Sequence, residues 1–94
     1  MPYLSAYAFA YRDFETRQDT FLRQIFGMIQ CLPYGDHGTH AIHQGIEEAL
    51  TGRPVALLGG HGVVCVGADL EDALGLIEAA ENYAKTVFIK DKLI

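Results

Sequence analysis

A glycine-rich turn between two apolar segments constrains the fold of this 94-residue chain more than any other feature. Residues 54–67 read PVALLGGHGVVCVG, and the apolar flanks Val55–Leu58 and Val63–Val66 have the length and composition of buried strands. Because only four residues separate the flanks, we expect the strands to be antiparallel or closely adjacent. The glycines let the backbone take positive φ angles or let another group come close. The pattern therefore places one imidazole, that of His61, at the end of a strand.

Helical patterns lie on both sides of this turn. Downstream, Asp69 is predicted to cap a long helix that continues past Phe88, because small and apolar residues recur there on one stripe. Upstream, Thr39 is predicted to cap a helix that runs to about Thr51 and stops at Gly52. Strands and helices thus alternate along this part of the chain.

The N-terminal third has weaker patterns. We expect a helix from Pro2 to Tyr11, a polar loop over 12–17, a short helix over 18–26 and a short strand over 28–32. Pro33 ends this strand, because the residue before a proline is pushed toward extended angles. Three tyrosines recur at helical spacing in the first helix and are predicted to form a packing stripe: Tyr3, Tyr7 and Tyr11.

Composition excludes several classes of protein. The net charge is −5 and neither half contains a cluster of Lys and Arg, so a nucleic-acid partner is excluded. No apolar run approaches the roughly 20 residues of a membrane span, and we expect a cytoplasmic protein that does not contact membranes. Half of the residues are hydrophobic, which predicts that some apolar surface meets another chain. Cys31 and Cys65 are expected to be free buried thiols.

A second group of histidines lies upstream of the turn. His40, His43 and Glu47 are spaced i, i+3, i+7 on the polar face of the predicted helix, and His37 precedes them. A metal site on this face is one interpretation. The other is a row of solvated side chains, because a three-ligand site needs convergent ligands held by further hydrogen bonds, which an exposed helix face seldom provides.

The residues around the turn resemble the C-terminal half of the class II aldolase/adducin family. The resemblance is carried by a series of short motifs: Pro33-Tyr34, Gly38-Thr39, Leu57–Val64, Gly67, Asp69–Glu71, Ala73, Glu81 and Ala84. It implies an α/β fold that is part of a three-layer α/β/α sandwich with a mixed, largely antiparallel sheet. Residues 1–94 would then form a single partial domain without the N-terminal half of the family's fold.

The resemblance also implies a metal site. In family enzymes this turn supplies the third histidine ligand of a divalent metal, usually Zn2+, and His61 matches that residue. The first two ligands come from an earlier His-x-His pair. Pro2 and its neighbours resemble the residues directly after that pair, which puts Met1 where the second histidine belongs. The catalytic glutamate lies earlier still. His61 is therefore the metal ligand that the resemblance implies here, and no catalytic or cofactor-binding residue is assigned.

Two functions are consistent with these residues. The first is a zinc-dependent sugar-phosphate aldolase, that is a carbon–carbon lyase, or an epimerase, incomplete in this chain alone and completed by an N-terminal fragment, with a sugar phosphate as substrate. The alternative is a non-catalytic, oligomerising remnant or interaction module like an adducin head. A half-sheet with an exposed edge predicts self-association or pairing with the absent segment in either case. In a third interpretation, His61 is a structural histidine that is hydrogen-bonded within a strand turn.

Overall fold

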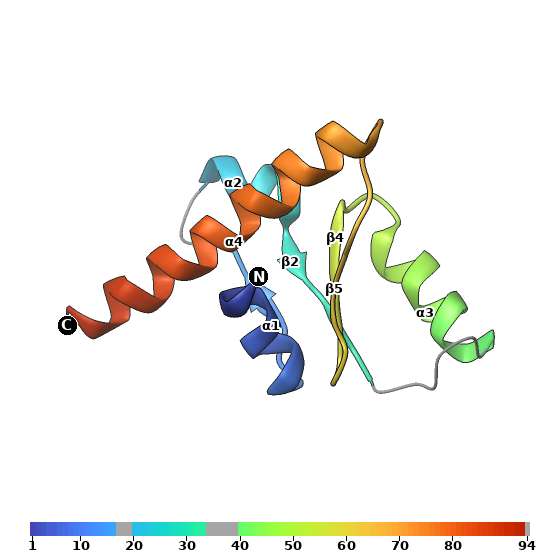
Figure 1. Ribbon diagram of the computed structural model, residues 1–94, viewed down its shortest axis with the longest axis horizontal. Helices are drawn as coiled ribbons and strands as arrows, with labels where there is room; N and C mark the ends of the chain where they lie inside the picture. The colour runs from blue at the N-terminus through green and yellow to red at the C-terminus, as the bar shows by residue number, and fades with distance from the viewer. Residues whose placement is uncertain (17–19, 34–39, 94) are drawn as a thin grey trace.

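The computed structural model describes residues 1–16, 20–33 and 40–93, and the side chains of these residues except 20–22 and 40–44. Helices and strands follow one another along the chain (Figure 1): α1 (Pro2–Phe9), β1 (Phe14–Glu15), α2 (Thr20–Phe26), β2 (Met28–Ile29), β3 (Cys31–Leu32), α3 (His40–Leu50), β4 (Val55–Leu58), β5 (Gly62–Cys65) and α4 (Leu70–Lys92). The predicted cap Thr39 lies outside the described residues.

The main sheet is built around the predicted hairpin. β4 lies between β3, to which it is parallel, and β5, to which it is antiparallel. Leu57 is opposite Val63 and Leu58 is opposite Gly62, so the two apolar flanks pair directly across the glycine turn. β1 and β2 form a separate antiparallel pair. The mixed, largely antiparallel strand arrangement expected from the sequence is confirmed.

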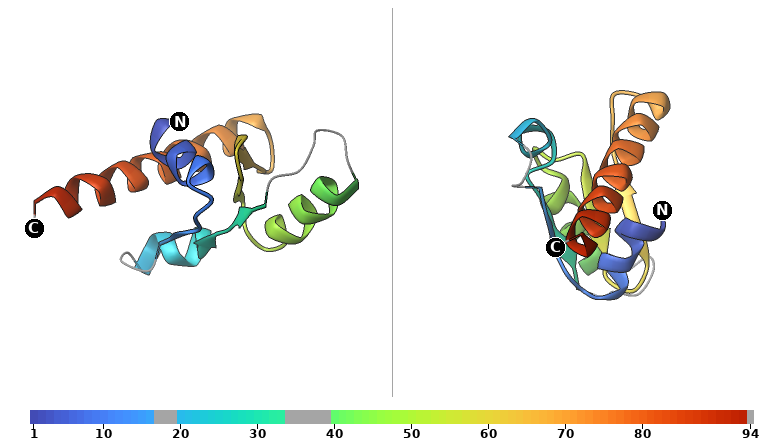
Figure 2. Two further views of the ribbon diagram at one scale, coloured as in Figure 1. Left: turned by 90° about the horizontal axis from the view of Figure 1, so that it is seen from below. Right: turned by 90° about the vertical axis from the view of Figure 1, so that its left-hand side faces the viewer.

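Helices cover both faces of the main sheet (Figures 1 and 2). Side chains alternate between the two faces of a strand, and Val55 and Leu57 accordingly pack in one cluster with α1 and α4, which contribute Leu4 and Ala84. Ala56 faces the other way and belongs to a second cluster with residues of β3 and α3. This arrangement of helix, sheet and helix confirms the predicted α/β fold class.

Helix α4 begins and ends as its sequence predicts. The Asp69 side chain caps it by accepting the N–H of Asp72 at 2.8 Å, and Asp72 in turn accepts the N–H of Ala68 at 2.9 Å. The helix passes Phe88 and ends at Lys92. Its C-terminal part projects beyond the sheet and the other helices (Figure 1). Within the described residues, no helix is long and apolar enough to cross a membrane.

A carboxylate of α4 holds the beginning of α1. The Glu81 side chain accepts the backbone N–H groups of Tyr3 at 3.0 Å and Leu4 at 2.8 Å. The N–H of Ser5 already donates to Met1 O within the helix, and Pro2 has no N–H. Glu81 therefore satisfies both remaining donors in the first turn of α1, which has no side-chain cap of its own.

Three local predictions differ from the structure. The segment 12–17, predicted to be a polar loop, contains β1, and Phe14 is only 3% exposed because it packs between α1 and α4. The predicted strand 28–32 is divided at Gln30, so that its halves pair with different partners. The first helix ends at Phe9, which leaves Tyr11 outside the helix, whereas Tyr3 and Tyr7 make ring contacts as expected.

Candidate functional site

The histidine turn is held by backbone hydrogen bonds to three different elements. The N–H of His61 donates to Leu58 O at 2.9 Å, which closes the turn at the end of β4. The N–H of Gly59 donates to Leu32 O of β3 at 2.9 Å, and the N–H of Gly60 donates to Ala8 O of α1 at 3.1 Å. The backbone beneath the imidazole is therefore fixed by the sheet on one side and by α1 on the other.

Glycine is required in this turn for two separate reasons. Gly60 and Gly62 have φ angles of 75° and 151°, a region that residues with a Cβ atom rarely adopt. Gly59 is buried, and a Cβ atom on it would lie 2.5 Å from Leu32 O and 2.7 Å from the Tyr11 ring. The glycines thus bring β3 and Tyr11 into direct contact with the residues before His61.

Tyr11 was predicted only as part of a packing stripe, and the structure gives it a different position. It has a φ of 57°, and its N–H donates to Ala8 O at 3.2 Å while that of Arg12 donates to Tyr7 O at 3.0 Å. These two bonds form a Schellman cap on α1, in which glycine or asparagine usually occupies the left-handed position. A tyrosine there costs about 1 kcal/mol or more in backbone strain. Because tyrosine is unusual at this position, the amino-acid sequence does not predict the left-handed turn at Tyr11.

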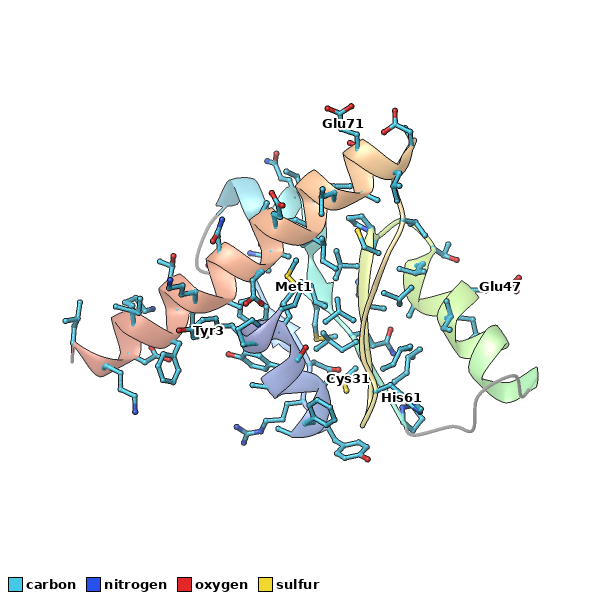
Figure 3. All side chains as sticks on the ribbon, in the orientation of Figure 1. Met1, Tyr3, Cys31, Glu47, His61 and Glu71 are labelled. Carbon is cyan, nitrogen blue, oxygen red and sulfur yellow. The ribbon has the colours of Figure 1, made fainter. Side chains whose placement is uncertain are left out.

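The His61 side chain is half-buried and lies at the end of the β4–β5 hairpin (Figure 3). Figure 3 also shows that Met1 lies well away from it. The turn contacts α1 at Ala8, about 10 Å along the helix axis from Met1 at about 1.5 Å of rise per residue. A metal-ligating side chain at position 1 would thus have to span most of the length of α1 to reach a metal ion bound to His61.

The described residues do not provide a complete metal site around His61. Among the described residues, no three or more His, Cys, Asp and Glu side chains are grouped so that they could hold a metal ion. Glu47 is exposed on α3, and Figure 3 shows it far from His61. His37, and the side chains of His40 and His43, lie outside the part of the chain that is described. The alternative metal site on that helix face thus stays a prediction.

The two cysteines are free, as predicted, and lie on β3 and β5. They are half-buried rather than fully buried. Burial, followed by the charge of Asp13, raises the pKa of the Cys31 thiol above its usual range, and burial, followed by the charge of Asp72, does the same for Cys65. Because the thiolate is the nucleophile, both thiols should be poorly reactive at neutral pH.

This expectation can be measured with iodoacetamide. At pH 7.5 the folded chain should be alkylated more slowly than the same chain in urea, and the rate should rise with pH over a higher pH range in the folded chain than in urea. Mass spectrometry of each cysteine peptide over time gives the two rates separately. Rapid labelling of the folded chain at neutral pH would show that one thiol is activated and that its surroundings are not as described.

Comparison with known proteins identifies the fold. A family model described as the class II aldolase and adducin N-terminal domain matches residues 1–88. Among solved structures, an L-fuculose 1-phosphate aldolase is similar, with a TM-score of 0.82 at 20% sequence identity. The match covers 97% of this chain and 42% of that chain, so this chain spans less than half of that aldolase. A search of curated proteins finds no match. Because the family model matches nearly the whole chain, the chain belongs to the class II aldolase and adducin family.

Proposed function

We propose that this chain is one part of a metal-dependent sugar-phosphate aldolase or epimerase, in which His61 is one of the metal ligands. Residues 1–94 would form a single partial domain, and the other ligands and the sugar-phosphate contacts would come from polypeptide outside it. The observation that carries the proposal is the histidine turn, which is fixed by β3, β4 and α1 and presents a half-buried imidazole at the end of the sheet. Family membership supports it.

The described residues do not fit a zinc ion on their own. A catalytic zinc site has three protein ligands and one open position, and a single imidazole does not hold the ion. Since the described residues contain no group of three ligating side chains, we assign no catalytic step to a metal in this chain alone. The proposal therefore requires a complementing segment that supplies the other ligands.

For the location of the protein we propose the cytoplasm. Both cysteines are free, which agrees with a reducing compartment.

The test compares zinc content with and without the complementing segment. The chain is co-expressed with the coding sequence upstream of it, purified, and analysed for zinc by atomic emission and for aldol cleavage of L-fuculose 1-phosphate. We expect zinc in the complex, and at least about a tenfold loss of zinc affinity on His61→Asn. His43→Asn is the comparison variant and should keep the zinc; a loss of zinc in His43→Asn instead of His61→Asn would point to the alternative metal site on the face of α3. A complex without zinc or turnover, or one in which His61→Asn keeps its zinc, would contradict the proposal.

A second candidate function is a non-catalytic module that oligomerises. It is favoured by the exposed apolar side chains of α4, among them Leu70, Leu74 and Phe88, together with the absence of a complete ligand set among the described residues. It predicts a stable oligomer in which His61→Ala changes neither the metal content nor the melting temperature. Zinc that is present in the wild-type chain and lost in His61→Ala would exclude this function.

A further inference from the structure

We propose that a hollow beside α2 binds a phosphate-type oxyanion, that is, a free phosphate ion or the phosphate group of a larger molecule. We call it the arginine hollow. It has a volume of about 330 Å³ and is lined by residues of β1, α2, β2 and the segment between α3 and β4: Glu15, Thr16, Arg23, Gly27, Met28 and Arg53. The class of ligand follows from how one arginine is held and from the charge of the lining.

The backbone of β2 holds the Arg53 side chain in place. Its Nη1 donates to Met28 O at 3.0 Å, and the side chain is half-buried. A guanidinium group carries five N–H donors in one plane, so the bond to Met28 fixes this plane without using its capacity to donate. An arginine that is already ordered loses little conformational freedom when it binds an anion.

The backbone at Gly27 lets the Arg53 side chain reach the hollow. Gly27 ends α2 with a φ of 57°, and its N–H donates to Arg23 O at 2.9 Å. A Cβ atom on Gly27 would lie 3.5 Å from Arg53 Nε, so a longer side chain would compete with the guanidinium for the same space. On the other side the buried Thr16 hydroxyl donates to Gly27 O. The floor of the hollow is therefore formed before a ligand arrives.

The charge of the lining favours an anion with two negative charges. Arg23 in the last turn of α2 and Arg53 before β4 contribute two positive charges, and Glu15 contributes one negative charge. The lining is thus positive in a chain whose net charge is −5. Guanidinium groups bind phosphate through paired N–H···O bonds. A phosphate dianion can accept from both arginines and balance both charges, whereas a single carboxylate balances only one.

The arginine hollow and His61 lie toward opposite ends of β4. Arg53 precedes the first residue of this strand, and His61 follows the last. Four strand residues span about 13 Å. With the same orientation in both pictures, Figure 1 shows α2 toward the upper end of β4, and Figure 3 shows His61 at its lower end. The inference therefore does not depend on a metal at His61, and its failure would leave the proposed function unaffected.

Titration of the ¹⁵N-labelled chain with inorganic phosphate tests the proposal. At about pH 7.5 and low ionic strength much of the phosphate is dianionic and little screened. We expect saturable shifts of the Gly27 amide and the Arg53 Nε–H resonances, with a dissociation constant of about 1 mM. Phenyl phosphate and acetate are titrated in parallel. Tighter binding of phenyl phosphate than of inorganic phosphate would identify a phosphate ester as the ligand, and the reverse order would identify the free ion.

Three variants separate charge from geometry. Arg23→Gln removes one positive charge and should weaken phosphate binding about tenfold. Arg53→Lys keeps the charge but not the planar fork, and should weaken it about threefold or more. Glu15→Gln removes the negative charge from the lining and should strengthen binding about threefold. All three side chains are exposed or half-buried, and circular dichroism verifies that each variant is folded.

The matched control is Arg12→Gln, which makes the same change in net charge as Arg23→Gln. Arg12 is exposed and follows the end of α1 that contacts the histidine turn, so phosphate affinity should stay unchanged. A wild-type chain without saturable shifts at about 20 mM phosphate would overturn the proposal. Equal weakening by Arg12→Gln and Arg23→Gln would also overturn it, because net charge alone would then attract the anion. Acetate that binds as tightly as phosphate would exclude phosphate as the preferred ligand.

Discussion

Replacing Gly59 with alanine is expected to destabilise the chain by about 2 kcal/mol, which corresponds to a fall of about 10 °C in the melting temperature. The added methyl group would lie 2.5 Å from Leu32 O and 2.7 Å from the Tyr11 ring. The exposed ring of Tyr11 can turn aside. The oxygen of Leu32 cannot, because it belongs to β3 and accepts the N–H of Gly59 in the pairing of β3 with β4.

Two further variants identify the cause of the effect. Gly45→Ala is the matched control: a Cβ atom there would make an ordinary contact of 3.6 Å with Leu32, and alanine within α3 should stabilise the chain by about 0.5–1 kcal/mol. Adding Tyr11→Ala to Gly59→Ala removes the ring but keeps a Cβ atom at the positive φ of residue 11, and it should recover only a minor part of the loss, since the carbonyl clash remains. Urea unfolding followed by circular dichroism measures all three. Full recovery in the double variant would show that the ring, and not β3, causes the clash.

The features that the sequence predicted are those that depend on neighbouring residues. The hairpin of β4 and β5 follows from two β-branched flanks and the glycines between them. The beginning of α4 follows from the Asp69 cap, which bonds a residue only three positions away. Each of these features depends on residues that are close together in the sequence, so it can be predicted without knowing which distant segments meet in the folded chain.

The features that could not be predicted depend on contacts between distant residues. β1 lies in a charged segment, and it is a strand because Phe14 pairs opposite Ile29 and is buried against Tyr7 and Tyr83. The predicted strand 28–32 is two strands in the structure, because its first half pairs with β1 whereas its second half pairs with β4. The residues next to Phe14 and those of segment 28–32 do not indicate which strands they pair with.

The candidate site shows the same division. The glycine pattern identifies the turn and His61, and the structure confirms that the turn joins two strands of the sheet. The groups that fix the turn, Ala8 O, Leu32 O and the Tyr11 ring, come from elements some thirty to fifty residues earlier in the sequence. The role of His61 as a metal ligand stays a prediction, because it depends on groups that the described residues do not provide.

Removing the Glu81 carboxylate should have the largest effect that we expect from one side chain. In Glu81→Ala, the N–H groups of Tyr3 and Leu4 lose their acceptor, and Leu4 is fully buried. Hydrogen bonds to a charged group contribute about 1.5–3 kcal/mol each, and buried donors without an acceptor add a further cost. We expect a loss of about 3 kcal/mol. Glu81→Gln, whose amide oxygen accepts only one of the two N–H groups, should lose roughly half as much.

Urea unfolding of dilute protein gives the two free energies, and hydrogen exchange at the Leu4 amide shows whether the first turn of α1 opens. The matched control is Glu78→Ala, which removes an exposed carboxylate from the same helix and should change stability by less than about 0.5 kcal/mol. If Glu81→Ala were no more harmful than this control, the cap on α1 would be absent in solution.

The Glu81 variants also test how the histidine turn is positioned. α1 is held by Glu81 near its beginning, and near its end Ala8 O accepts the N–H of Gly60, the residue before His61. If α1 transmits this constraint, Glu81→Gln should shift the amide resonance of Gly60 while the chain remains folded, and Glu78→Ala should not. A Gly60 resonance that is unchanged in Glu81→Gln would mean that β3 and β4 alone hold the turn. The order of His61 would then not depend on the first turn of α1.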